Sequence, residues 1–172
     1  RLRSRGLGDV YKRQESIAAY AAPIAADYDA YTAASVVAET IDRLVAAEHE
    51  RVPAQYQLLI GALHALAKGA HRPQAIGDSY VMRALALAGW APRLGSCVVC
   101  GEPVETSTAI YCSIAAGGVM CAADRTPEAR KYDPATIRQF AALVRGDWDV
   151  LDAEALTGET RRLVEEWSEY YM

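Results

Sequence analysis

Apolar residues recur at steps of three and four along most of the chain, which is the spacing of one face of a helix. The first such stripe follows Asp27 and consists of Tyr31, Ala34, Val37, Ile41, Leu44 and Val45. The same spacing predicts a second helix over 54–68, with apolar positions at Tyr56, Leu59, Ile60, Leu63 and Leu66. A third helix is predicted over 73–88. The pattern therefore favours a mainly helical protein.

Two further helices are predicted near the end of the chain. Asp133-Pro134 is typical of a helix start, because proline suits the first helical position and aspartate the cap before it. The last helix is expected to begin near 158. Glycines mark the ends of three predicted helices, at Gly69, Gly89 and Gly146. Gly61 lies inside the second helix, where we expect a neighbouring helix to cross closely.

The segment between the third and fourth helices has a different pattern. Short apolar runs flank Ala116-Gly117-Gly118 and predict a β-hairpin over 111–120. This hairpin follows a Cys-x-x-Cys motif at Cys97 and Cys100. The predicted fold class is mainly α, a helical domain with an inserted small zinc-knuckle and β-hairpin module.

All four cysteines of the chain, Cys97, Cys100, Cys112 and Cys121, belong to this insert. A Cys-x-x-Cys motif places two thiols on one tight turn, where both reach a single tetrahedral ion. Strand alternation places Cys112 and Cys121 on the same face of the hairpin. The spacing predicts one structural Zn²⁺ ion.

Two other interpretations of the cysteines stay open. A redox Cys-x-x-Cys usually follows a strand and opens a helix. Here Pro92, Gly95, Gly101 and Pro103 surround the motif and disfavour a helix. Buried cysteines that bind no metal are the other alternative.

Composition indicates a globular chain, with 52% hydrophobic and 23% charged residues among 172. No run approaches the ~20 apolar residues of a membrane span, so no membrane association is expected. Residues 1–14 contain five basic residues and one acidic residue, and the chain does not begin with methionine. We interpret 1–14 as a non-native leader, with a basic arm for nucleic acid as the alternative.

No catalytic group stands out elsewhere in the sequence. None of the three histidines has a nucleophile or an HExxH partner at a suggestive spacing, and there is no Walker loop or GxGxxG motif. Asp78 is expected on the solvated face of its helix, and the three tryptophans are expected in core contacts. The sequence therefore predicts a protein that is not an enzyme.

Residues 15–171 resemble the RecO family of bacterial recombination mediators. The matching segments are Tyr28–Thr32, Arg72–Gln74, Cys97–Gly101, Ser113–Cys121 and Trp167–Tyr171. The resemblance implies an N-terminal OB-fold followed by a helical domain with an inserted zinc knuckle. It divides this chain into the end of an OB-fold (15–26), a first helical part (27–92), a knuckle (93–126) and a second, truncated helical part (127–172). The OB-fold itself is expected to be missing.

The resemblance also implies a function in DNA repair. Members bind DNA, anneal strands, bind the C-terminal tail of single-strand binding protein, and act with RecR to load RecA. DNA binding is expected mainly through the missing OB-fold, and the location is cytoplasmic and nucleoid-associated. Lys68, Arg72 and Arg83 are candidate contacts for the acidic tail, by sequence neighbourhood alone.

The chain departs from the family at one zinc ligand. Zinc-bearing members usually carry a second Cys-x-x-Cys motif, whereas Cys121 is followed here by Ala122-Ala123-Asp124. Cys112 is the preferred fourth ligand, because thiolates are the commoner structural ligands. Asp124 or water is the alternative. Two other functions remain: an enzyme fragment braced by a zinc ribbon, and a small thiol-disulfide protein.

Overall fold

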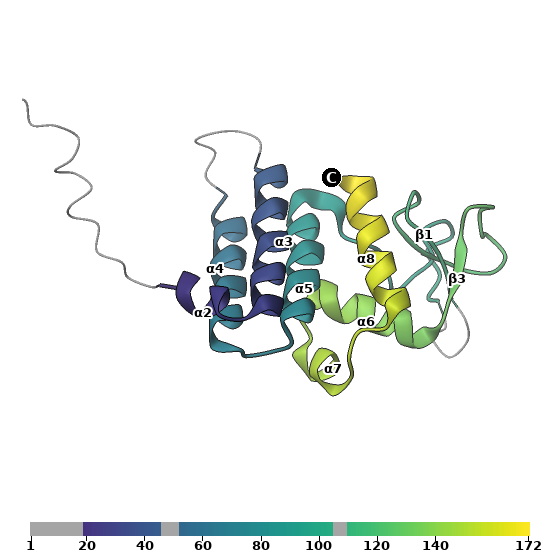
Figure 1. Cartoon of the computed structure of the whole chain (residues 1–172). Coiled ribbons are helices and arrows are strands. Elements are labelled where there is room, and N and C mark those ends of the chain that lie inside the picture. The colour runs from purple at the N-terminus through teal and green to yellow at the C-terminus, as the bar shows by residue number, and fades with distance from the viewer. Residues whose placement is uncertain (1–18, 46–51, 105–109) are drawn as a thin grey trace, which may run out of the picture.

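The computed structural model describes residues 19–45, 52–104 and 110–172 (Figure 1). Helices α3 (Tyr28–Leu44), α4 (Pro53–Lys68) and α5 (Pro73–Leu85) stand side by side (Figure 1). Helix α8 (Gly158–Tyr171) runs beside α5, and α6 (Pro134–Arg145) lies below α5 and α8. A small sheet lies at the far end from α4. The predicted mainly helical fold with a β-hairpin insert is thereby confirmed. The proposed leader at 1–14 lies outside the described residues.

The helices begin and end close to the predicted positions. Those of the first helical part are α2 (Ala21–Ala25), α3 (Tyr28–Leu44), α4 (Pro53–Lys68) and α5 (Pro73–Leu85), and α5 continues into one π-helical turn (Ala86–Trp90). Those of the second part are α6 (Pro134–Arg145), α7 (Trp148–Ala153) and α8 (Gly158–Tyr171). The short helices α2 and α7 were not predicted, because two turns or fewer carry too little periodic pattern to be recognised.

Helix ends follow from local chemistry. Gly69 and Gly146 end α4 and α6 in the left-handed conformation, with φ of 60° and 68°, which glycine adopts without steric cost. Asp27 caps α3 by accepting a hydrogen bond from the backbone N–H of Ala30 at 2.9 Å. Asp133 takes the predicted position before Pro134, but its side chain makes no cap hydrogen bond.

Helix α5 is the centre of the helical part. It contacts α3, α4, α6 and α8, and most of its residues from Ala75 to Leu85 are buried. One side joins a cluster of small and branched residues from α2, α3 and α4. Its C-terminal half joins a larger cluster with α6, α8 and the sheet, which contains Phe140 and Trp167. A helix buried on nearly all sides in this way connects both halves of the core.

The buried stripe of α3 differs from the prediction. Ala30, Ala33, Val37 and Thr40 face the core, whereas Tyr31 is 58% exposed. The reason lies on α5, where a Cβ at Gly77 would stand 3.4 Å from the Cβ of Ala33. Small residues let the two backbones approach, so the alanine face packs inward. The predicted close crossing at Gly61 is wrong, since nothing lies within 4 Å of a Cβ placed there.

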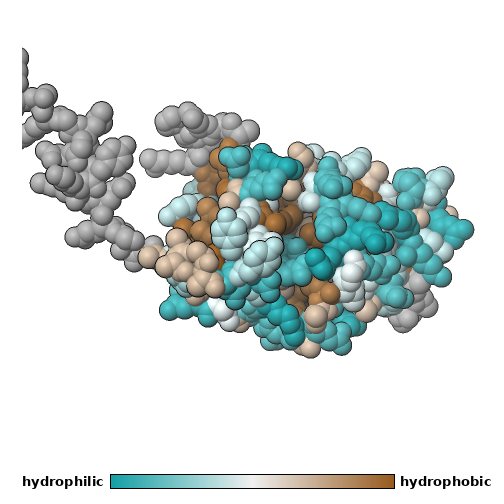
Figure 2. Space-filling model, viewed as in Figure 1, coloured by the Kyte–Doolittle hydropathy of each residue, from teal (hydrophilic) through white to brown (hydrophobic). Residues whose placement is uncertain are grey.

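The sheet has three antiparallel strands in the order β2-β1-β3: β1 (Ile110–Ser113), β2 (Gly118–Met120) and β3 (Arg130–Tyr132). In the predicted hairpin, Tyr111 pairs with Met120 and Ser113 with Gly118. The third strand was not predicted. Hydrophilic residues cover most of the sheet end, and hydrophobic residues gather toward α3 and α4 (Figure 2). Within the described ranges, no helix is long and apolar enough to cross a bilayer.

Candidate metal centre

The loop that carries Cys97 and Cys100 is a tight knuckle held by backbone hydrogen bonds. The N–H of Cys97 donates to the carbonyl of Glu102 at 2.8 Å, and the N–H of Gly101 donates to the carbonyl of Cys97 at 3.0 Å. Gly101 makes the turn possible with a φ of 80°. The N–H of Val99 also donates to the Cys97 sulfur at 3.4 Å. Both thiols of the motif therefore project from one turn.

The knuckle is attached to the hairpin by its stem and by its first turn. Arg93 pairs with Gly118 through two hydrogen bonds of 2.9 Å, from its N–H to Gly117 and from Val119 to its carbonyl. The N–H of Val98 donates to the carbonyl of Val119, also at 2.9 Å. These contacts bring the knuckle next to Cys121, which follows directly after β2.

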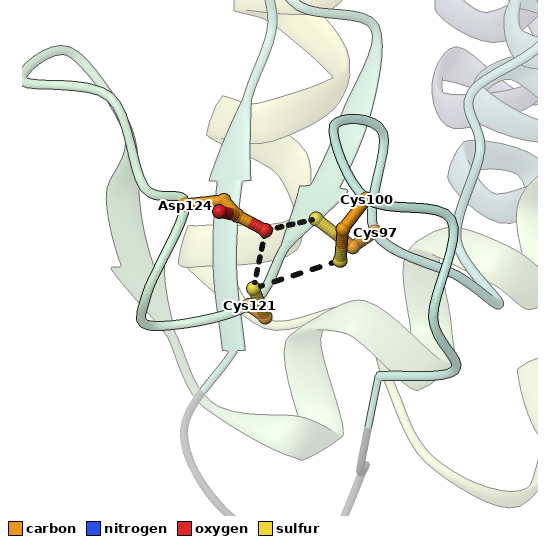
Figure 3. A group of neighbouring side chains, drawn as sticks. All are labelled: Cys97, Cys100, Cys121 and Asp124. Atoms are coloured by element: carbon orange, nitrogen blue, oxygen red, sulfur yellow. Dashed lines mark hydrogen bonds between the residues drawn. The ribbon is translucent and has the colours of Figure 1, made fainter.

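Four side chains converge at this junction. The sulfurs of Cys97, Cys100 and Cys121 and a carboxylate oxygen of Asp124 point toward one another (Figure 3), and all four atoms lie within 4.8 Å of each other. The Cys100 and Cys121 sulfurs are 3.9 Å apart, and Asp124 Oδ2 lies 3.0 Å from Cys121 and 3.9 Å from Cys97. Within the part of the chain that the structure describes, no other such group of three or more potential ligands occurs.

These distances match the needs of a tetrahedral ion. Thiolates at ~2.3 Å from zinc in a tetrahedron are about 3.8 Å from each other. The donor set of three sulfurs and one carboxylate oxygen also suits zinc, which takes both ligand types. The side chains present therefore fit a metal ion, and zinc is consistent with the geometry.

The electrostatics of the group favour charged ligands at two positions. Backbone hydrogen bonds from Cys100, Cys121 and Val99 lower the pKa of Cys97 to about 7. A hydrogen bond from the Cys121 thiol holds the pKa of the Asp124 carboxyl below its ordinary value. Metals bind the deprotonated forms of both groups. All four cysteines are free thiols.

Cys112 lies apart from the four converging side chains. It pairs with Val119 in the hairpin and is 2% exposed within the apolar cluster of α6, α8 and the sheet. Burial raises the pKa of the Cys112 thiol to about 12. The strand β2 ends at Met120, and Cys112 is not among the side chains that converge with Cys121. The structure therefore places Asp124, the alternative fourth ligand, and not the preferred Cys112 beside the three other sulfurs.

The three predicted partner-binding cations lie in different surroundings. Lys68 is exposed in the last turn of α4. Arg72 donates to the carbonyls of Leu151 and Asp152, each at 3.1 Å, and so fastens α7. Arg83 lines a groove of about 600 Å³ between α4 and α5. The structure does not bring these three side chains together.

Two side chains differ from their sequence-based interpretation. Asp78 is half-buried, and one of its carboxylate oxygens has no partner among the described residues. Burial raises the pKa of Asp78 to about 6, against the opposing effect of Arg161. Trp90 is 48% exposed and stacks on Tyr171 with ring centroids 5.1 Å apart. No periodic signal marked either feature, because both depend on α8, which is distant in sequence.

Comparisons with known proteins agree with the described fold. A family model described as "Recombination protein O C terminal" matches residues 25–172. A DNA repair protein RecO of Bifidobacterium longum is 61% identical over 164 residues, which cover 95% of this chain and 67% of that protein. One from Bifidobacterium adolescentis is 57% identical over 168 residues, covering 95% and 68%. One from Streptomyces coelicolor is 38% identical over 141 residues, covering 82% and 56%.

Proposed function

Because this chain belongs to the RecO family of bacterial DNA repair proteins, we propose that it is a non-enzymatic mediator of recombinational repair. Its partners are single-strand binding protein, RecR and DNA, and its place is the cytoplasm, next to the nucleoid. With them it loads RecA and anneals strands. The relatives' shared name, DNA repair protein RecO, supports the repair role and leaves no reason to prefer an enzyme fragment.

The proposed metal is a single structural zinc ion held by Cys97, Cys100, Cys121 and Asp124. Four protein donors complete a tetrahedral site and leave no position for substrate, as is typical of structural zinc. When bound, the ion supplies a folding constraint and no catalysis. The chain's own residues then hold the knuckle against the hairpin through Arg93 and Val98.

The groove beside Arg83 is the feature that carries the proposed partner role. Its walls are mainly apolar and include Leu58, Ala62, Ile76 and Trp148. Tyr80 also lines it, and its buried hydroxyl has no hydrogen-bond partner among the described residues. Burial raises the pKa of Tyr80 to about 12, so the hydroxyl stays protonated.

Tyr80 and Arg83 are three residues apart on α5, so their side chains lie on the same face of the helix. A phenol donor and a guanidinium next to an apolar cavity suit a ligand that carries both an apolar side chain and a carboxylate. The acidic tail of single-strand binding protein has this chemistry. We assign its binding to this groove, with Arg83 as the cation; Lys68 and Arg72 are not among its lining residues.

DNA binding by this chain is proposed to be weak. The net charge is −4 for the whole chain and −8 once the first 14 residues are set aside. DNA affinity depends on lysine and arginine residues that neutralise phosphates. We therefore place strand binding and annealing mainly in the OB-fold of the full-length family architecture.

A titration tests this division of roles. A fluorescein-labelled tail peptide of single-strand binding protein and an oligothymidylate are each titrated with the chain at 50 mM and 300 mM salt. The peptide should bind more tightly than the oligonucleotide, and its affinity should fall with salt because part of it is charge pairing. Tight DNA binding without a response to the peptide would overturn the proposal.

Matched variants locate the groove. Tyr80→Phe removes only the hydroxyl, Arg83→Ala removes the cation, and Gly61→Leu fills the groove from α4, where an added side chain meets no neighbour. Each should weaken peptide binding several-fold. Arg162→Ala, at an exposed position on α8, should leave it unchanged. Equal affinities for all four variants and the unmodified chain would exclude this groove.

A further inference from the structure

A second groove lies where the zinc knuckle meets α6. Its volume is about 430 Å³. One wall is the stem of the knuckle, with Leu94 and Gly95, and the other is α6, with Ile137 and Ala141. Neither the proposed structural zinc site nor the proposed peptide binding at Tyr80 and Arg83 depends on this groove.

The charged residues of this groove are of one sign. Arg138 and Arg145 line it, both exposed on α6, and no acidic residue is among its lining residues in the part of the chain that the structure describes. In the described ranges, neither arginine takes part in an ion pair. They are seven residues apart, so they project from the same side of the helix about 10.5 Å apart along its axis. Two unpaired guanidinium groups therefore border an apolar cavity.

The chemistry of the lining distinguishes two kinds of anionic ligand. Proteins that hold single-stranded nucleic acid usually stack its bases on aromatic side chains. Among the described residues, no aromatic side chain lines this groove, and the uncharged lining side chains are aliphatic or proline. An extended peptide with aliphatic side chains fills such a cavity, and its carboxylates pair with guanidinium groups.

We propose that this groove is a docking site for an acidic protein segment that carries aliphatic side chains. Arg138 and Arg145 bind its carboxylates, and the cavity between Leu94 and Ile137 receives its apolar side chains. The assignment is independent of the groove at Tyr80 and Arg83, since the two sites use different cations. It adds a second protein-binding surface to the chain, on the side of the metal centre.

Gly95 provides a way to change the groove without disturbing the fold. Nothing lies within 4 Å of a Cβ placed at Gly95, and its backbone is outside the left-handed region. A side chain is therefore tolerated there, at a residue that lines the groove. Gly95→Glu adds a repulsive charge for an acidic ligand, and Gly95→Lys adds an attractive one.

The experiment is fluorescence anisotropy with the full chain. The probe is a labelled twelve-residue peptide of four Asp-Asp-Leu repeats, compared with a peptide of four Asn-Asn-Leu repeats and with oligothymidylate. The double variant Arg138→Ala/Arg145→Ala should lower affinity for the acidic peptide about tenfold, since each exposed pair contributes a few-fold. Gly95→Glu should lower the affinity and Gly95→Lys should raise it, while Arg162→Ala should leave it unchanged.

Three outcomes would overturn the proposal. One is equal binding of the acidic and the amide peptide. Another is a double variant that binds like Arg162→Ala. The third is that oligothymidylate binds more tightly than the acidic peptide and that the double variant no longer binds it. That result would make the groove a nucleic-acid surface.

Discussion

The contact between Arg93 and Gly118 makes the strongest prediction about the metal centre. Gly118 begins β2 and lies directly against the backbone of Arg93. A methyl group at Gly118 would overlap the carbonyl oxygen of Arg93 and stand 2.9 Å from its carbonyl carbon. Since the obstructing atoms are backbone, no side-chain rotation relieves the overlap. Gly118→Ala should therefore push the stem of the knuckle away from the hairpin.

The size of the effect follows from the contacts that are lost. Separation breaks the hydrogen bonds from Arg93 to Gly117 and from Val119 to Arg93, both 2.9 Å long. Each contributes about 1 kcal/mol net, so the local loss is about 2 kcal/mol. Because an insert with little core of its own folds together with its metal, this loss should appear in the zinc affinity. The expected weakening is about 30-fold.

The measurement is competition for zinc between the chain and a chromogenic chelator. Gly95→Ala is the matched control, because it makes the same substitution in the same stem where nothing lies within 4 Å. Amide exchange at Val119 should rise in Gly118→Ala and not in Gly95→Ala. If both variants hold zinc as tightly as the unmodified chain, the stem contact does not support the metal site and the reasoning fails.

Other predictions concern the ligands, the metal and one half-buried acid. Asp124→Ala should lower zinc affinity more than tenfold. Cys112→Ala should leave zinc content unchanged and lower the free energy of unfolding by about 1–2 kcal/mol, because it opens a small cavity in the core. If a zinc assay shows that Cys112→Ala loses more zinc than Asp124→Ala, Cys112 is the ligand. Removal of the metal by a chelator should raise amide exchange in 94–104 and 110–125, while the helices stay protected. Equal protection of these segments with and without metal would contradict a role of the metal in folding. The pKa of Asp78 is about 6 in the folded chain, against an ordinary value of 3.8. Its burial should therefore lower the free energy of unfolding by up to about 3 kcal/mol. This loss of stability is absent below pH 4, grows as pH rises and is complete above pH 6. Asp78→Asn should remove that loss of stability. If the denaturation curves of Asp78→Asn and of the unmodified chain coincide at pH 4 and also at pH 8, the prediction is wrong.

Several features follow from the sequence because they depend on nearby residues. The spacing of apolar positions gave the five main helices, and Gly69, Gly146 and Pro134 marked their ends through backbone preferences that act locally. The Cys-x-x-Cys motif and the Gly117-Gly118 turn likewise predicted a knuckle and a hairpin. The family resemblance rests on the same short segments.

The tertiary structure decided which side chains meet. Tyr31 belongs to an apolar stripe, yet Gly77 lets α5 approach Ala33, so that Ala33 faces the core and Tyr31 is exposed. Cys112 has the parity of a ligand but is buried in the core, while Asp124, which the sequence offered only as an alternative, faces three sulfurs. Periodicity describes one element at a time, whereas burial and ligand geometry depend on what a distant segment places opposite it.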